Sequence, residues 1–180
     1  MDTKRIILNA VVQLVSKKGI SNVTVQEIID QASVSRRTFY KYYRDKYDAI
    51  NSYFSWEVEK SIKNKFNGHN WEEIAIDISI LLRDHSDYFS EVARLNSFDS
   101  FYHYLRRWTE ETYTSFYKKN TGKDRLNEEE EMLISFYAVG NLIYVEKILK
   151  EPEKFKKDSV IRNYVRMVLK NVPEIYYTIL

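Results

Sequence analysis

The sequence predicts an all-α fold, and three observations support this prediction. Apolar residues recur at helical spacing almost from end to end of the 180-residue chain. Residues that interrupt helices are scarce, with four glycines and two prolines. The chain is 44% hydrophobic, so it can bury a core. We expect about nine helices, arranged as a three-helix helix-turn-helix domain over residues 1–48 and a helical bundle over residues 49–180.

The first helix is expected to begin near Asp2 or Thr3 and to end at Gly19, which suits a left-handed C-terminal cap. Lys17 and Lys18 precede that glycine and complement the negative end of the helix dipole. The inward stripe of this helix comprises Ile6, Ile7, Ala10, Val11, Leu14 and Val15.

A capping box predicts the start of a second helix. Thr24 is followed three residues later by Glu27, and these two side chains can satisfy backbone N–H groups that a helix start leaves free. The buried face of this helix is expected to consist of Val25, Ile28, Ile29 and Ala32.

A turn at residues 33–34 separates this helix from a third. Ser35 caps the third helix, which is expected to end near Arg44. Asp45 caps a fourth helix, which is expected to run to about Lys65.

The third helix is predicted to have one basic and aromatic face. At about 100° per residue, Phe39 and Tyr43 lie on the opposite side, where they can pack on the first two helices. The outward residues are Arg36, Arg37, Tyr40, Lys41 and Arg44. A helix of this kind fits the major groove of B-DNA, where arginine can bridge guanine O6 and N7. A solvated basic helix is the alternative. The capping box, turn and outward face occur together at the proper spacing, which favours DNA reading.

Positive charge is concentrated in the same region. Residues 1–50 hold nine Lys+Arg and five Asp+Glu, a net charge of +4, and the rest of the chain has 19 and 21, a net of −2, which together give +2. A basic N-terminal quarter can attract polyphosphate.

Residues 5–50 resemble the DNA-binding domain of TetR-family transcriptional regulators. The resemblance is carried by IILNAVVQLVSKKGISNVTVQEI (6–28), Ala-Ser-Val-Ser (32–35), Thr-Phe-Tyr (38–40), Tyr-Tyr (42–43) and Asp-Lys (45–46). The chain departs from the family pattern at Ser33, where many members have glycine, and at Tyr43, where phenylalanine is usual. Neither departure is expected to abolish the fold.

The resemblance implies a set of DNA-binding residues. Thr24 and Lys46 would hold phosphates at the N-termini of the second and fourth helices. The base edges would face Arg36, Arg37 and Lys41. Thr38, Tyr40 and Tyr42 would lie at the groove wall. Ser35, at the start of the third helix, completes the set. Partial core packing is the alternative for the two tyrosines, and a solvent-facing side chain is the alternative for Lys46.

The rest of the chain predicts further helices, at residues 71–85, 87–96, 98–119, 128–150 and 159–171. Asn127 and Glu130 form a second capping-box pattern, and Pro152 follows the end of that helix.

Self-association is implied by the family resemblance, because members dimerise through their last two long helices. The candidate interface residues are Phe136, Gly140, Ile143, Tyr144, Ile161, Val165 and Val168. The alternative is that some of these form the intrachain core. A two-fold homodimer would place two recognition helices about 34–36 Å apart, facing a near-palindromic DNA operator.

An aromatic-rich segment at residues 98–119 suggests a pocket for a small apolar or aromatic effector. The candidate ligand-binding residues are Phe101, Tyr102, His103, Trp108 and Tyr137. The alternative is that these rings fill the core. Residues 136–155 also resemble the short sensing domain of Firmicutes members, some of which answer to protein partners. Two functions are therefore considered. The first is a repressor that a small effector releases from DNA, and the alternative is a helix-turn-helix activator or co-regulator controlled by a protein partner.

Other functional classes are disfavoured. The chain lacks cysteine and the motifs of common enzymes, so we expect no catalysis, metal or cofactor. No stretch is expected to span a membrane, since even residues 74–82 are interrupted by Asp77. The start has no signal-peptide pattern. We therefore expect a homodimeric, cytoplasmic regulator, more readily a repressor than an activator. A protein-binding adaptor that has lost DNA affinity is disfavoured by the basic third helix.

Overall fold

The computed structural model describes residues 2–62, 71–94 and 100–173, and within these ranges the chain is helical with no strand. The helices are α1 (Thr3–Lys18), η1 (Ile20–Asn22), α2 (Val25–Ala32), α3 (Arg36–Tyr42), α4 (Lys46–Ile62), α5 (Trp71–Asp84), α6 (Ser86–Ala93), α7 (Phe101–Thr121), α8 (Glu128–Lys150), η2 (Pro152–Phe155) and α9 (Asp158–Leu169). Here η denotes a short 3-10 helix. The described part thus confirms the all-α fold and the nine α-helices.

The chain packs as two units. The first contains residues up to 59 together with the described residues of 87–101, and the second contains residues 60–86 and those from 102 onward. The first unit is therefore larger than the predicted domain of residues 1–48, because much of α4, together with α6, packs with it. The functional boundary after residue 48 stays a prediction.

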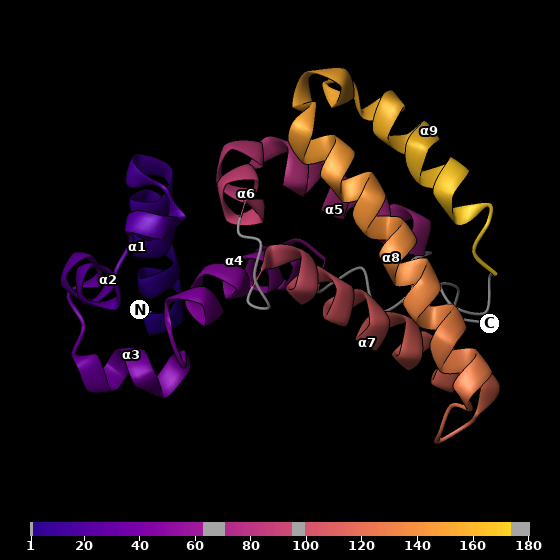
Figure 1. Ribbon diagram of the computed structural model, residues 1–180, viewed down its shortest axis with the longest axis horizontal. Coiled ribbons are helices and arrows are strands. Elements are labelled where there is room, and N and C mark those ends of the chain that lie inside the picture. Colours follow the sequence, from indigo (N-terminus) through magenta and orange to yellow (C-terminus); the bar gives the residue numbers. More distant parts are fainter. Residues whose placement is uncertain (1, 63–70, 95–99, 174–180) are drawn as a thin grey trace. The chain divides into compact units, whose positions relative to one another are not determined.

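Helices α1, α2 and α3 lie together at the indigo end of the chain (Figure 1). As predicted, α1 begins at Thr3, and the Asp2 side chain caps it by accepting from the Lys4 amide at 3.0 Å. Gly19 stands at the C-cap with φ 76°, but its ψ is 153°. The chain therefore extends into η1 instead of adopting the predicted left-handed helical cap. A Cβ at this glycine would lie 3.2 Å from Glu91 Oε2, which adds a steric reason for glycine.

The buried stripe of α1 differs from the prediction at its edges. Ile7, Ala10, Val11 and Val15 are buried as expected. Leu8 is also buried, whereas Ile6 and Leu14 are only half-buried. The buried arc of the helix is therefore turned toward the side of Leu8.

The core of the first unit beside α4 is aromatic. The Phe101 ring stacks on Phe89, with centroids 5.1 Å apart, and meets Phe54 edge-on at 5.7 Å. Tyr88 packs on Phe89 and donates its hydroxyl to the Ile50 carbonyl at 3.0 Å. Phe101, a predicted effector-pocket residue, is fully buried in this cluster.

In the second unit, α5 packs against α8 and α9. Arg83 of α5 donates to the Phe155 carbonyl at 3.2 Å and to Asp158 at 2.6 Å, which ties α5 to η2 and the start of α9. Tyr164 stacks on Tyr144, with centroids 6.0 Å apart.

Helices α7 and α8 are joined by polar contacts near their connection and further along both helices. Near the connection, Glu130 accepts from Tyr117 and Lys123. Further along, Tyr113 is fully buried and its hydroxyl accepts from Asn141 at 2.6 Å. The predicted capping box of α8 is confirmed, because Asn127 and Glu130 each accept from the other's backbone amide at 2.9 Å.

Several helix ends differ from the predictions. α3 ends at Tyr42, two residues before Arg44, because Tyr43 adopts an extended backbone with φ −139° and ψ 138°. α6 ends at Ala93 and α7 begins at Phe101, while the predicted helical residues 95–96 and 98–99 lie outside the described residues. The expected end of the fourth helix at Lys65 lies outside them as well.

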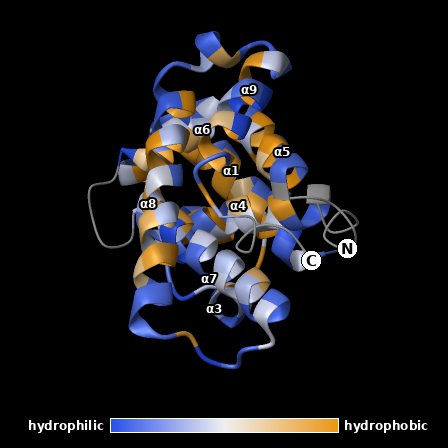
Figure 2. Cartoon of the chain, turned by 90° about the vertical axis from the view of Figure 1, so that its right-hand side faces the viewer, coloured by the Kyte–Doolittle hydropathy of each residue, from blue (hydrophilic) through white to orange (hydrophobic). Residues whose placement is uncertain are grey.

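Of the described helices, α8 is long and apolar enough to cross a membrane by length and composition. This property was not expected from the sequence, in which no apolar stretch was judged long enough to span a membrane. A core helix of a soluble protein passes the same test, but only 28% of the apolar window of α8 is buried. The colouring in Figure 2 shows the apolar stretch of α8 following its hydrophilic first turn. This helix therefore presents apolar side chains outside the core of its own chain.

Candidate nucleic-acid interface

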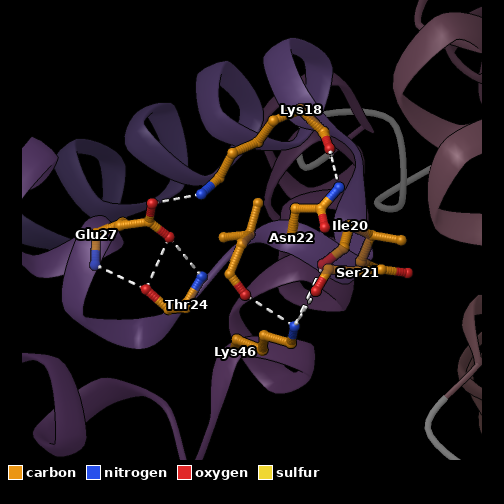
Figure 3. Close-up of polar contacts among 8 residues, drawn as sticks. Lys18, Ile20, Ser21, Asn22, Thr24, Glu27 and Lys46 are labelled. Carbon is orange, nitrogen blue, oxygen red and sulfur yellow. Dashed lines mark hydrogen bonds and ion pairs between the residues drawn. The ribbon is translucent and has the colours of Figure 1, made fainter.

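The first turn of α2 is fixed by the predicted capping box. The Glu27 amide donates to Thr24 Oγ1 at 3.3 Å, and the Glu27 carboxylate accepts from the Thr24 amide at 2.9 Å. Lys18 of α1 also donates to this carboxylate (Figure 3). These contacts with Lys18 and Thr24 lower the pKa of Glu27 to about 2. The Thr24 side chain thus caps α2, with the Glu27 carboxylate beside it.

The turn between α2 and α3 depends on Ser33. This residue has φ 52° and ψ 43°, and it is the one described residue other than glycine with positive φ. Its amide donates to the Asp30 carbonyl at 3.2 Å, and the Val34 amide donates to the Ile29 carbonyl at 3.2 Å. The left-handed conformation explains why glycine is favoured at this position, and these backbone bonds hold the turn with serine in place.

The start and the inner face of α3 are also held locally. Ser35 Oγ accepts from the Thr38 amide at 3.0 Å and lies 2.8 Å from Thr38 Oγ1. On the inner face, Phe39 and Tyr43 are buried, with ring centroids 5.8 Å apart. These contacts fix the rotation of α3 about its own axis.

The outer face of α3 is basic and aromatic, as predicted. Its exposed side chains are Arg36, Arg37, Tyr40, Lys41 and, just beyond the helix end, Arg44. The Arg36 guanidinium lies 5.9 Å from the centroid of the Tyr40 ring, and the Lys41 ammonium lies 5.5 Å from that of Tyr42. Tyr40 is 49% exposed, which argues against core packing, whereas Tyr42 is half-buried.

The junction from α3 to α4 is capped at Asp45, as predicted. Asp45 Oδ1 accepts from the Asp48 amide at 2.8 Å, and Asp48 in turn accepts from the Arg44 amide at 2.9 Å. The Arg44 side chain remains 81% exposed.

Lys46 makes contacts within the chain that the sequence did not suggest. Its ammonium group points to backbone carbonyls that follow α1, and its closest contact is the Val23 carbonyl at 2.8 Å (Figure 3). The side chain is half-buried, so it is not a plain solvent lysine, and its binding to a phosphate stays a prediction.

The predicted ligand-binding residues are divided between the two units. Phe101 is in the core of the first unit, while Tyr102, His103 and Trp108 follow on α7 in the second. His103 is exposed, and Tyr102, Trp108 and Tyr137 are half-buried. Burial, with Glu146 nearby, raises the pKa of Tyr102.

The candidate dimer residues divide between core and surface. Three of them are buried within the chain, as expected if they form the intrachain core: Tyr144, Ile161 and Val165. Val168 is half-buried. Phe136 is 70% exposed and Ile143 is 60% exposed. Leu133, which shares the helical spacing of these residues, is also exposed, and the exposed apolar residues that the sequence reasoning missed are Met132, Val139 and Met167. The sequence could have revealed the exposed residues of α8, because helical spacing places Met132, Leu133 and Val139 on the same face as Phe136.

Comparison with known proteins identifies two matching family models. The model described as bacterial regulatory proteins, tetR family, matches residues 7–51, and the model described as transcriptional regulator C-terminal region matches residues 69–170. A comparison with curated proteins found no match.

Solved structures share the fold along nearly the whole chain. The dihydroxyacetone kinase operon activator DhaS is 18% identical with a TM-score of 0.61, and the match covers 98% of each chain. A TetR transcriptional regulator from Streptococcus agalactiae is 22% identical with a TM-score of 0.57, and covers 92% of this chain and 93% of that one. The fatty acid degradation regulator FadR from Bacillus halodurans is 17% identical with a TM-score of 0.57, covering 96% and 97%. At these identities the similarity demonstrates the fold.

Proposed function

Because the chain belongs to the tetR family of bacterial regulatory proteins, we propose that it is a sequence-specific repressor that binds a near-palindromic operator as a homodimer. The observation that carries this proposal is the outer face of α3. Arginines, a lysine and a tyrosine are exposed there, while Phe39 and Tyr43 anchor the opposite face in the core. A short helix held in this way can enter a major groove without rearranging.

The exposed residues suggest a division of roles. Arg36, Arg37 and Lys41 are free to reach base edges, while Tyr40 and the half-buried Tyr42 suit the groove wall. Thr24, Ser35 and Thr38 already hold helix starts through their side chains. We assign these three an indirect role, in which they place the backbone at helix N-termini near phosphates.

The exposed face of α8 supports the homodimer. Met132, Phe136, Val139 and Ile143 recur at spacings of four, three and four residues, which puts them on one side of the helix. Gly140 lies within the same stripe, and apart from its chain neighbours and the nearby backbone of α8, no atom of the described residues comes within 4 Å of the place where its Cβ would be. A second copy of α8 can therefore approach closely at this glycine. Met167 of α9, which is 57% exposed, is the candidate contribution of the last helix.

An effector would act through α4. This helix follows α3, the proposed recognition helix, after a short connection. The boundary between the two packing units falls within α4, after Glu59. If an effector binds the second unit and shifts α4, then the affinities for DNA and effector must be reciprocally linked. The described candidates for such a site are Tyr102, Trp108 and Tyr137.

Control by a protein partner, with activation in place of repression, is the second candidate function. It is favoured by the structural match named as an operon activator. The many aromatic residues of α7 that are committed to the core also favour it, since they leave fewer rings for a ligand.

Fluorescence anisotropy would test the DNA-binding proposal. The probe is a duplex that the protein enriches from random DNA, compared with a scrambled duplex of the same composition. Arg36→Ala/Arg37→Ala should lose the preference for the enriched duplex, because each bidentate arginine contributes about 1–3 kcal/mol of discrimination. The matched control is Lys156→Ala/Lys157→Ala, which removes the same charge from exposed residues of the second unit. Retained preference in the arginine variant, or equal loss in the control, would contradict the proposal.

A further inference from the structure

Lys46 reaches from the first turn of α4 to the α1–α2 corner, which we define as residues 19–23. Its ammonium group donates to the carbonyl of Val23 at 2.8 Å, that of Ile20 at 3.3 Å and that of Ser21 at 3.4 Å (Figure 3). An ammonium group has three N–H donors and no acceptor. The three carbonyls therefore match its full hydrogen-bonding capacity.

The same corner is tied to both neighbouring helices. Asn22 Nδ2 donates to the Lys18 carbonyl at 2.8 Å, which closes the end of α1. The Lys18 ammonium in turn donates to Glu27 of the α2 capping box. Consequently α1, the corner and the start of α2 form one continuous polar network, to which Lys46 adds the start of α4 (Figure 3).

This network bears on α3 because of where α3 lies in the chain. The recognition helix has only seven residues, follows α2 after a short turn and leads directly into α4. Helix α4 is attached to the α1–α2 corner through Lys46, and α2 is attached to the end of α1 through the bond between Glu27 and Lys18. Breaking the Lys46 hydrogen bonds would release the attachment on the C-terminal side of α3.

We propose that Lys46 is a positioning residue, which holds α4 on the α1–α2 corner and thereby sets how α3 presents its exposed face, and not a phosphate ligand. The proposal rests on the proposed DNA-binding function. A phosphate oxygen could take the ammonium group only by displacing carbonyls that already accept from it. The consequence for regulation is that a shift of α4 must either carry the corner with it or break these hydrogen bonds.

The salt dependence of DNA binding distinguishes the two roles. Removing a side chain that binds one phosphate makes the slope of log K against log salt concentration shallower by about 0.9, whereas removing a positioning side chain leaves that slope unchanged. The variants are Lys46→Met and, as a matched control, Lys41→Met on the exposed face of α3. Each is measured against the enriched and the scrambled duplex over a salt series, together with thermal unfolding.

We expect Lys46→Met to keep the wild-type salt slope, to lose about tenfold of its preference for the enriched duplex, and to melt about 4–8 °C lower. Lys41→Met, which removes an exposed charge on the outer face of α3, should instead melt like the wild type. Lys46→Arg, which keeps a cationic donor, should restore both the melting temperature and the preference. If Lys46→Met does not fold, Lys46→Gln removes the charge while keeping a donor, and gives the same slope comparison.

Three results would overturn the proposal: a reduced slope with unchanged melting in Lys46→Met, equal weakening on both duplexes, or no rescue by Lys46→Arg. Failure of the proposed function is recognised separately, since the wild type would then show no preference for any duplex. In that case the melting of Lys46→Met and Lys46→Arg still decides whether Lys46 holds α4 to the corner: a lower melting temperature with rescue supports the attachment, and unchanged melting overturns it.

Discussion

Replacing Phe136 by aspartate should separate the proposed homodimer into monomers. Phe136 is 70% exposed at the centre of the apolar stripe of α8. An aromatic side chain has about 200 Å² of surface, so about 140 Å² of this ring is available for burial by a partner. At about 25 cal/mol per Å², that area corresponds to about 3.5 kcal/mol for each protomer.

A two-fold interface contains this ring twice, so complete burial would contribute about 7 kcal/mol as an upper bound. Association also costs side-chain ordering and desolvation, so buried area overestimates affinity. We therefore expect Phe136→Asp to weaken the dimer by about 4 kcal/mol, which is about a thousandfold in Kd. The two introduced carboxylates add repulsion across the symmetry axis.

Sedimentation velocity over a range of protein concentrations measures this change, and circular dichroism shows whether the helices are retained. Tyr40→Asp is the matched control, because Tyr40 is an exposed aromatic residue on α3, outside the α8 stripe. It should impair DNA binding and leave the dimer intact. A Phe136→Asp protein that sediments like the wild type at every concentration would refute the assignment of this face.

Three other predictions concern α8 and the two capping boxes. Gly140→Leu should leave the monomer folded, because open space surrounds this position, yet weaken the dimer at least tenfold by sedimentation; unchanged association would mean that no helix crosses closely there. Thr24→Ala and Asn127→Ala should each destabilise the fold by about 1 kcal/mol in urea unfolding, and only Thr24→Ala should also weaken DNA binding. Glu27 and Glu130 both have a pKa lowered from 4.5 to about 2, so the stability that they contribute above pH 4.5 should be lost as the pH falls toward 2. Replacing both by glutamine should flatten acid unfolding in this range, and an unchanged acid transition would show that other carboxylates control it.

Local patterns in the sequence predicted the helix starts well. The capping boxes at Thr24 and Asn127 and the caps at Ser35 and Asp45 all form as expected, and α1 begins where it was expected, after Asp2. Each involves residues two or three positions apart, so the relevant geometry is set by the helix itself. The outward face of α3 was predictable for the same reason, because its buried and exposed residues follow from helical periodicity.

Contacts between distant segments could not be predicted in this way. Ile143 and Tyr144 are adjacent in sequence and similarly apolar, yet Ile143 is exposed while Tyr144 packs on Tyr164 of α9. Phe101 was grouped with the other rings of α7, but it packs on Phe89 of α6. The contacts of Lys46 could not be predicted either, because its acceptors are backbone carbonyls, which every residue type carries.

The distribution of aromatic side chains along α7 narrows how this regulator can be controlled. Phe101, Tyr113, Phe116 and Tyr117 are buried, and Tyr113 also holds Asn141 of α8. These rings serve the cores of the two units, so a ligand that used them would have to open that packing. The exposed apolar stripe of α8 can be contacted by a partner without opening any packing of this chain. An input that acts by changing how α8 associates, whether with a second copy or another protein, therefore requires less rearrangement of this chain than an effector buried among the α7 rings.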